Sequence, residues 1–320
     1  MSASLSEQSM HADEIAIDTS LVQRLVARQF PQCAHLEVSR LTASGSSNML
    51  FRLGQELLVR LPRQPGGGAA IGKEHRWSPY LQQQLPVAVS EIVAVGQADE
   101  EYGERFSIVR WQVGVHPAAF GSQDFANHAQ RLRAEDFAVL LKAFAGMPVP
   151  EDALTAPELT RQYRGLPLAA CDQYTRKNIQ RCRALTGLEL DLDAAELVWD
   201  QAMGLPGATE GTGVVSWFHG DMVAENLLMT DGRLCGLLDF GGLGIGDPTV
   251  DLHGAWEFLD APGREILKRQ LAVDDAQWLR GRAWALAIAL MTFPYYWASM
   301  PDRVQSRLAM ARAVLADAAA

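Results

Sequence analysis

Three polar residues in one short segment combine the side chains that phosphoryl transfer requires. Asp221 ends the tripeptide His-Gly-Asp, Asn226 follows five positions later, and Asp239 begins the tripeptide Asp-Phe-Gly. An aspartate at the head of a tight loop can orient and deprotonate a hydroxyl group. An asparagine amide oxygen and a second carboxylate are hard oxygen ligands for the Mg²⁺ that accompanies a nucleoside triphosphate. The pattern therefore indicates a catalytic aspartate and a Mg²⁺ site.

The residues between Asn226 and Asp239 predict a hairpin that brings the two together. Apolar positions at Leu227 and Leu228 precede an Asp231-Gly232 turn, and further apolar positions lead to Leu238. Two strands joined by an Asp-Gly turn return the chain to the same end. Either tripeptide alone is typical of an ordinary loop or turn. Their occurrence in order, within one segment that continues to Gly246-Asp247-Pro248 and Asp251, favours a functional site.

This segment resembles the aminoglycoside phosphotransferase family, small-molecule kinases with a protein-kinase-like fold whose catalytic loop begins His-Gly-Asp where protein kinases have His-Arg-Asp. The resemblance implies roles for five residues: catalytic Asp221, Mg²⁺ ligands Asn226 and Asp239, a structural His219, and Asp251 as a hydrogen-bonding buttress. It extends over nearly the whole chain, but its specific motifs lie between 219 and 251. A protein kinase is disfavoured because Gly246-Asp247-Pro248 follows Asp-Phe-Gly too closely for a peptide-docking activation segment.

Length and composition favour a two-lobed protein of the cytoplasm. The chain has 320 residues, 48% of them hydrophobic, which suits two lobes around one site. Residues 1–14 are polar and expected to be flexible, with no signal-peptide pattern, and no apolar stretch is long enough to cross a membrane. The 4 cysteines form no Cys-x-x-Cys pair, so neither zinc nor a disulfide framework is expected.

The charge of the chain bears on its partners. A formal net charge of −10 argues against a nucleic-acid partner, which is bound through clustered lysine and arginine. It is compatible with a cationic small-molecule acceptor. Solubility alone is the simpler explanation of such a charge.

The region after residue 15 has the pattern of a small antiparallel sheet with two helices. Ser20 and Gln23 have capping-box spacing for a first helix that Pro31 ends. Three strand-like runs follow between Val38 and Pro62, with a Ser/Gly loop over 43–48. Ser46 and Ser47 of this loop are candidates for binding nucleotide phosphates, although most such loops are only hairpin connections.

Two charged residues of this region are candidates for nucleotide alignment. Arg60 lies on the third strand where the family usually has a lysine, and guanidinium is not geometrically equivalent to ammonium. The resemblance implies that Glu74, on a helix that Pro79 is expected to kink or interrupt, pairs with Arg60. The alternatives are an exposed strand cation and an ordinary glutamate on a solvated helix face.

The last strand-like run, Phe106 to Gly114, is the expected hinge. The resemblance implies that backbone groups from Val109 to Trp111 meet the base edge of the nucleotide and that Gly114 marks the lobe boundary. Trp111 is equally compatible with a core tryptophan.

The remainder is mostly helical in pattern and is expected to bind the acceptor. Within an insertion over 159–203, Asp193, Glu196 and Asp200 fall on one helical face, which either contacts substrate or merely meets water. The aromatic residues Trp256, Trp284 and Tyr295 to Trp297 are core by expectation, or a surface for a ring substrate.

The sequence thus predicts an α+β, protein-kinase-like fold, with a nucleotide-binding N-lobe over 15–113 and a larger, mostly helical C-lobe over 114–320. The expected reaction is transfer of a phosphoryl group from ATP or GTP, with Mg²⁺, to a hydroxyl of a small molecule such as an aminoglycoside-like antibiotic. The alternatives are a neutral macrolide, a housekeeping sugar or amino alcohol, and a catalytically silent nucleotide-binding module.

Overall fold

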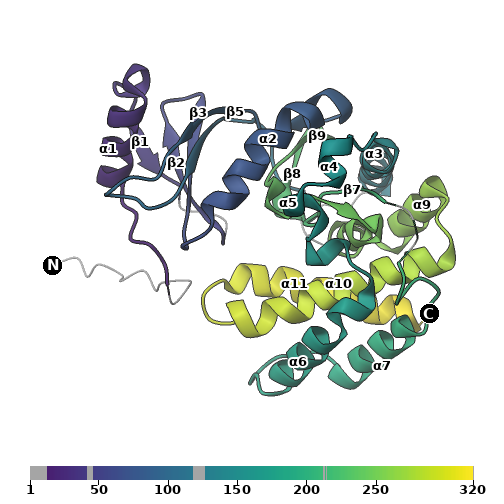
Figure 1. Cartoon of the computed structure of the whole chain (residues 1–320). Coiled ribbons are helices and arrows are strands. Elements are labelled where there is room, and N and C mark those ends of the chain that lie inside the picture. The colour runs from purple at the N-terminus through teal and green to yellow at the C-terminus, as the bar shows by residue number, and fades with distance from the viewer. Residues whose placement is uncertain (1–12, 42–45, 118–126, 212, 214, 320) are drawn as a thin grey trace. The chain divides into compact units, whose positions relative to one another are not determined.

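Figure 1 shows the computed structural model of the chain, which describes residues 13–41, 46–117, 127–211, 213 and 215–319. These residues fall into two compact units. Unit 1 lies within Met1–Gln83 and Val89–Val113, and unit 2 lies within Gln84–Ala88 and Gly114–Ala320. No helix within the described ranges has the length and apolar character needed to cross a membrane.

Unit 1 is built on an antiparallel sheet with strand order β1-β2-β3-β6-β5. Its strands are β1 (Val38–Arg40), β2 (Asn48–Leu53), β3 (Leu57–Pro62), β5 (Ile92–Gly96) and β6 (Phe106–Arg110), and its helices are α1 (Thr19–Gln29) and α2 (Gly68–Gln84). Every second residue of β2 is buried, as expected for a strand with one face on a core. The strand-like runs predicted between Val38 and Pro62 are all present.

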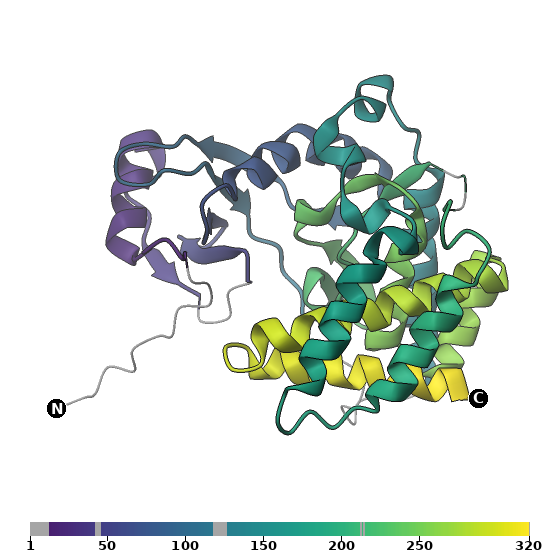
Figure 2. The same cartoon turned by 60° about the horizontal axis from the view of Figure 1, so that its bottom comes forward.

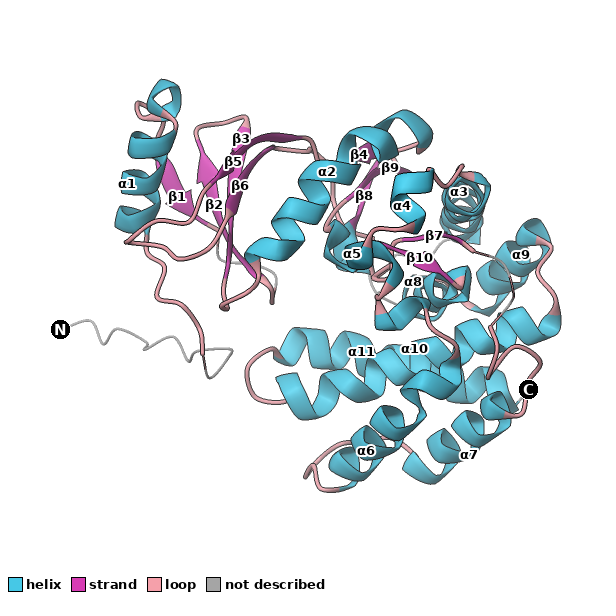
Figure 3. Ribbon diagram, viewed as in Figure 1, coloured by secondary structure: helices cyan, strands magenta, loops and turns pink. Residues whose placement is uncertain are grey.

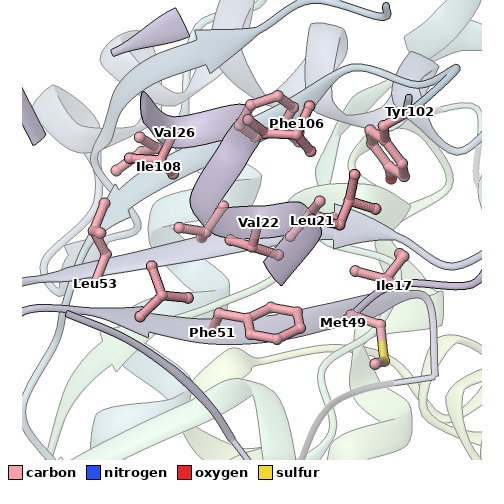
Figure 4. Close-up of a cluster of buried hydrophobic side chains, with 14 residues drawn as sticks. Ile17, Leu21, Val22, Val26, Met49, Phe51, Leu53, Tyr102, Phe106 and Ile108 are labelled. Carbon is pink, nitrogen blue, oxygen red and sulfur yellow. The ribbon is translucent and has the colours of Figure 1, made fainter. Parts of the chain in front are cut away.

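The core of unit 1 lies between α1 and the sheet. Figure 4 shows Leu21, Val22 and Val26 of α1 facing Phe51 and other buried side chains of the strands. Burial of this apolar stripe fixes the helix on the sheet.

Two local predictions for the helices of unit 1 were wrong. The N-cap of α1 is Asp18, whose Oδ1 accepts the Leu21 N–H at 2.7 Å, so Ser20 is already inside the helix. Helix α2 also continues through Pro79, so the expected interruption does not occur, whereas the alternative of a kink stays a prediction. The buried residues Ile71 and Trp77 before the proline and Leu81 after it hold both halves of α2 in place.

Unit 2 is mostly helical (Figure 3). Its helices are α3 (Asn127–Gly146), α4 (Glu151–Leu154), α5 (Pro157–Thr160), α6 (Asp172–Arg183), α7 (Leu192–Met203), α8 (Ala255–Phe258), α9 (Ala261–Leu271), α10 (Asp275–Tyr296) and α11 (Pro301–Ala319). Helices α6 and α7 lie side by side in Figures 1 and 2, and both pack against α10. Helix α10 is buried on nearly all sides and forms the centre of this unit.

Short strands in unit 2 carry the segments that the sequence marks for chemistry. Strand β7 (Ser216–Phe218) pairs with β10 (Gly244–Gly246), and β8 (Leu227–Thr230) pairs with β9 (Arg233–Leu237). The two-residue strand β4 (Ala88–Val89) falls at the division between the two units. An antiparallel sheet in one unit and a mostly helical second unit give the α+β class that the sequence predicts.

Candidate active site

The hairpin β8–β9 forms as predicted and brings Asn226 close to Asp239. Asp231 and Gly232 have φ values of 52° and 76°, the left-handed pair that a tight Asp-Gly hairpin turn requires. Leu227 pairs with Leu237, and the Leu238 N–H donates to the Asn226 carbonyl at 2.8 Å. The hairpin therefore places the two expected metal ligands at its open end.

His219 and Asp251 hold the loop that carries Asp221. The Asp251 carboxylate accepts the backbone N–H of His219 at 2.6 Å and of Gly220 at 2.7 Å, the buttress that the resemblance implies. His219 Nε2 lies 3.0 Å from the Leu238 carbonyl oxygen, and His219 Nδ1 accepts the backbone N–H of Asp221 at 3.2 Å. Gly220 has φ +81°, and a Cβ there would lie 2.6 Å from the Gly242 carbonyl oxygen. Glycine is therefore required in this loop.

Burial controls the protonation of both supporting side chains. His219 is fully buried and packs edge-on against Phe240 with ring centroids 5.0 Å apart. Burial lowers the pKa of His219, so the ring stays neutral, in agreement with a structural role. Burial raises the pKa of Asp251 to about 7, although its two backbone donors favour the ionised form.

Both carboxylate oxygens of Asp221 have a side-chain donor. Asn226 Nδ2 donates to Asp221 Oδ2 at 3.0 Å and to the Asp221 carbonyl at 2.9 Å. Arg164 Nη1 lies 2.5 Å from Asp221 Oδ1. Burial acts to raise the pKa of Asp221, but the Arg164 guanidinium outweighs it and holds this pKa below its usual range. Asp221 is therefore an ionised carboxylate that can accept a hydrogen bond from a hydroxyl group.

The local chemistry around Asn226 and Asp239 fits a magnesium ion. Because Asn226 directs its amide N–H₂ toward Asp221, its Oδ1 remains as an acceptor. Asp239 supplies a carboxylate directly after the hairpin, with Oδ1 also accepting the Gly241 N–H at 3.2 Å. Mg²⁺ characteristically takes one or two protein oxygens and completes its octahedron with phosphate and water. A dedicated cluster of several His, Cys, Asp or Glu side chains does not occur in the described residues.

Three residues that support the loop were missed by sequence reasoning. Arg164 belongs to a short 3₁₀ helix, Tyr163–Gly165, in which Gly165 packs against the Phe218 ring and accepts the Asp247 N–H at 3.0 Å. Glu257 of α8 accepts the Ala224 N–H at 2.9 Å and is paired with the buried Arg307 of α11. No motif marks these residues, because each lies more than 30 residues from its partner in the loop.

In unit 1 the structure forms the buried ion pair that the resemblance implies. Arg60 Nη1 and Nη2 donate to the two Glu74 carboxylate oxygens at 2.5 and 3.1 Å, and both residues are buried. The alternatives of an exposed strand cation and a solvated glutamate are thereby excluded.

The other nucleotide candidates of unit 1 lie at strand ends or inside the sheet. Ser46 and Ser47 directly precede β2, and the Ser47 carbonyl accepts the Arg63 N–H at 2.9 Å; loop residues 42–45 lie outside the described residues. Val109 is buried inside β6. Trp111 follows β6 and is 39% exposed, with Arg52 4.0 Å above its ring, so it is not a core tryptophan. The backbone N–H of Trp111 already donates to the Glu56 carbonyl at 2.7 Å.

The acidic helical face of the insertion is paired internally. Arg183 of α6 lies 2.7 Å from Asp193 and 2.8 Å from Glu196, and Arg176 lies 2.8 Å from Asp200. These contacts join α6 to α7. Of the aromatic residues, Trp256 and Trp284 are core, whereas Tyr295 is 54% exposed. The expected flexibility of 1–14 falls almost wholly outside the described residues, although Asp13 accepts a 2.7 Å hydrogen bond from Gln64.

Comparisons with known proteins agree with this geometry. A family model described as "Phosphotransferase enzyme family" matches residues 38–285. A viomycin phosphotransferase of Streptomyces vinaceus is 30% identical over 247 residues, which are 68% of this chain and 82% of that protein.

Solved structures show the same fold. An aminoglycoside 2'-phosphotransferase-IIIa in complex with GDP matches with a TM-score of 0.72 at 20% identity, covering 94% of this chain and 100% of that chain. A macrolide 2'-phosphotransferase type I matches with a TM-score of 0.63 at 17% identity, covering 95% and 98%. The protein-kinase-like fold class predicted from the sequence is confirmed.

Proposed function

Because the chain belongs to the phosphotransferase enzyme family and is a small-molecule kinase with an alcohol group as acceptor, we propose that it transfers the γ-phosphoryl group of ATP or GTP to a hydroxyl of an antibiotic. The observation that carries this proposal is the state of Asp221, an ionised carboxylate on a loop fixed by Asp251 and His219. The catalytically silent alternative is disfavoured because Asp221, Asn226 and Asp239 are all present.

In the proposed reaction Asp221 accepts a hydrogen bond from the acceptor hydroxyl. This bond directs the hydroxyl oxygen toward the γ-phosphorus. Since Arg164 keeps the pKa of Asp221 low, the carboxylate is a weak base. We therefore assign it orientation first and proton acceptance as transfer completes. When bound, Mg²⁺ neutralises charge on the phosphates, and Asn226 Oδ1 with the Asp239 carboxylate would hold it.

We assign nucleotide binding to unit 1. Arg60, aligned by Glu74, supplies a cation for the phosphates, and Ser46 and Ser47 supply hydroxyl and backbone donors. At the hinge, the Trp111 N–H is already bonded, so we propose its carbonyl as the acceptor that meets the base edge.

For the acceptor we propose a hydroxylated antibiotic, with an aminoglycoside-like cation as the first candidate. The viomycin phosphotransferase relative supports an antibiotic as the acceptor, and the net charge of −10 supports a cationic one. A neutral, macrolide-like acceptor is the second candidate. It is favoured by the internal pairing of Asp193, Glu196 and Asp200 and by the exposed Tyr295.

The test is nucleotide turnover with a panel of aminoglycosides, peptide antibiotics, macrolides, sugars and amino alcohols, for wild type and Asp221→Asn. We expect at least one acceptor, and a kcat that Asp221→Asn lowers about 10²- to 10⁴-fold with nucleotide affinity almost unchanged. Asp275→Asn, which removes an exposed carboxylate paired with Lys268, is the matched control and should keep wild-type kinetics. Near wild-type turnover in Asp221→Asn would remove this residue from the mechanism.

A further inference from the structure

Arg164 holds the expected catalytic carboxylate on the side opposite to Asn226. Its Nη1 donates to Asp221 Oδ1 at 2.5 Å and also to the Gly220 carbonyl, so one guanidinium contacts both the backbone and the side chain of the loop. Asn226 donates to the other carboxylate oxygen, Oδ2, at 3.0 Å. Two donors on two oxygens fix the plane of the carboxylate.

Arg164 is itself held in place by its neighbour. Its Nε donates to the Tyr163 hydroxyl at 2.8 Å, and its guanidinium lies 5.5 Å from the centre of the Tyr163 ring. Tyr163 in turn packs against the buried Trp284 of α10, with ring centroids 6.5 Å apart. Arg164 is thus connected through Tyr163 to the central helix of the unit, a support that the protein itself supplies.

The exposure of the two charged side chains shows why such a support matters. The Asp221 side chain is 34% exposed and, without a partner, would rotate about its side-chain bonds. The Arg164 side chain is only 18% exposed and its donors are directed to fixed acceptors. A partly buried, preorganised guanidinium retains an oriented interaction that a fully exposed ion pair would lose.

We propose that Arg164, supported by Tyr163, is a positioning residue for Asp221 that aligns the carboxylate with the acceptor hydroxyl and so determines kcat rather than nucleotide affinity. This inference rests on the proposed function. Arg164 contributes proximity and orientation, because a carboxylate that is free to rotate spends only part of its time in the reactive geometry.

The kinetic test compares Arg164→Gln, Arg164→Lys and Tyr163→Phe with wild type. Arg164→Gln should lower kcat for acceptor phosphorylation about 10- to 10²-fold, with the KM of the nucleotide within about twofold of wild type. Arg164→Lys should recover part of the loss, because it keeps a cation and a donor but cannot reach three acceptors at once. Tyr163→Phe keeps the ring, loses the hydroxyl and should fall between wild type and Arg164→Gln.

Arg176→Gln is the matched control. Arg176 is 40% exposed on α6, pairs with Asp172 and Asp200, and its loss should leave kcat unchanged. Thermal unfolding midpoints of all variants separate stability from alignment. A wild-type kcat in Arg164→Gln overturns the proposal. So does a loss of kcat that is as large in Arg164→Lys as in Arg164→Gln and that parallels the decrease in the unfolding midpoint across the variants.

A second measurement does not require turnover. In nitrogen-15 NMR spectra of the full chain, the Arg164 Nε–H signal, assigned by its loss in Arg164→Gln, should exchange slowly with water and should shift in Asp221→Asn and in Tyr163→Phe, but not in Arg176→Gln. If wild type phosphorylates none of the panel, the proposed function fails while this signal still tests the positioning. An Arg164 signal insensitive to Asp221→Asn and Tyr163→Phe overturns it.

Discussion

Asp239 lies in a backbone conformation that aspartate seldom adopts, with φ 56° and ψ 81°. Holding a non-glycine residue there costs on the order of 1–3 kcal/mol, and such strain is concentrated at functional sites. The conformation follows directly after β9 and presents the Asp239 carboxylate beside the end of the hairpin where Asn226 lies. The strain is therefore consistent with the assignment of Asp239 as a metal ligand.

Removing the Asp239 carboxylate should abolish Mg²⁺-dependent nucleotide binding. Asn226→Ala should weaken that binding less, because a neutral amide gives the cation less charge than a carboxylate does. Asp231→Ala is the matched control: Asp231 also has positive φ, at 52°, but lies in the exposed hairpin turn. Titration calorimetry with and without Mg²⁺ measures each variant. Unchanged Mg²⁺ dependence in Asp239→Ala would exclude it as a ligand.

The buried Arg60–Glu74 pair should act on nucleotide affinity. Arg60→Ala should raise the KM for the nucleotide about 10- to 10²-fold, as expected for loss of a charge-assisted contact to phosphate. Exchanging the two charges should not restore it, because a carboxylate would then face phosphate. Arg24→Gln, which removes an exposed partner of Glu101 from α1, is the control. If Arg60→Ala leaves nucleotide kinetics untouched, the phosphate contact lies elsewhere.

Sequence reasoning predicted the site contacts that lie within one short motif. It missed the contacts that form only when the fold brings distant segments together. Asn226 is five residues from Asp221, so the motif contains their contact. Arg164 is 57 residues away and reaches Asp221 only because Gly165 packs on the Phe218 ring next to the loop. An arginine in a loop without a motif gives no signal until the fold brings the two segments together.

The 3₁₀ segment Pro248–Gly254 carries two buried titratable groups, Asp251 and His253. His253 is fully buried and its Nε2 has no partner among the described residues. Burial lowers the pKa of His253 to about 3, below the value of 6.5 for the free side chain. Its folded pKa is depressed, so as pH falls the unfolded chain takes up a proton before the folded chain does.

The wild-type protein should therefore lose free energy of unfolding as pH falls below 6.5, and His253→Gln should remove this loss. Between pH 6.5 and about 3, His253 should lower the free energy of unfolding of wild type by up to about 1.4 kcal/mol for each pH unit. Asp251 titrates in the opposite sense but is common to both proteins, so it cancels in their difference. Urea unfolding at several pH values measures that difference. Curves that run parallel from pH 7 to 4 would contradict the prediction.

Elements were predictable where one residue pair dictates the backbone. The Asp231-Gly232 turn has few alternatives to a tight hairpin, and the apolar residues on both sides set the strand pairing. The start of α1 was misplaced because Asp18 and Ser20 are both good capping residues, and the burial of Leu21 decides between them. The continuity of α2 through Pro79 depends on tertiary packing that no local pattern contains.

For the whole molecule, the distribution of charge differs from what composition suggests. The net charge is −10, yet the carboxylates singled out in the insertion are paired with Arg176 and Arg183. In the segment after Trp256, Glu257 is paired with Arg307 and Asp260 caps α9. Such pairing was not predictable because each of these arginines lies on a different helix from its carboxylate partner, Arg176 and Arg183 on α6 and Arg307 on α11. Attraction of a cationic acceptor must therefore come from the overall field rather than from these side chains.

A field of that kind is screened by salt, which distinguishes the two candidate acceptors. The Debye length falls from about 30 Å at 0.01 M to about 8 Å at 0.15 M, so long-range attraction largely disappears over this range. For a cationic acceptor we expect its KM to rise roughly 3- to 10-fold across the range with kcat unchanged, because steering affects encounter and not the transfer step. Arg164 adds a reason why the rise should be moderate, since a guanidinium beside Asp221 repels ammonium groups next to the reacting hydroxyl. Steady-state kinetics with the compound that proves active measures the effect, and a flat acceptor KM would favour the neutral, macrolide-like acceptor instead.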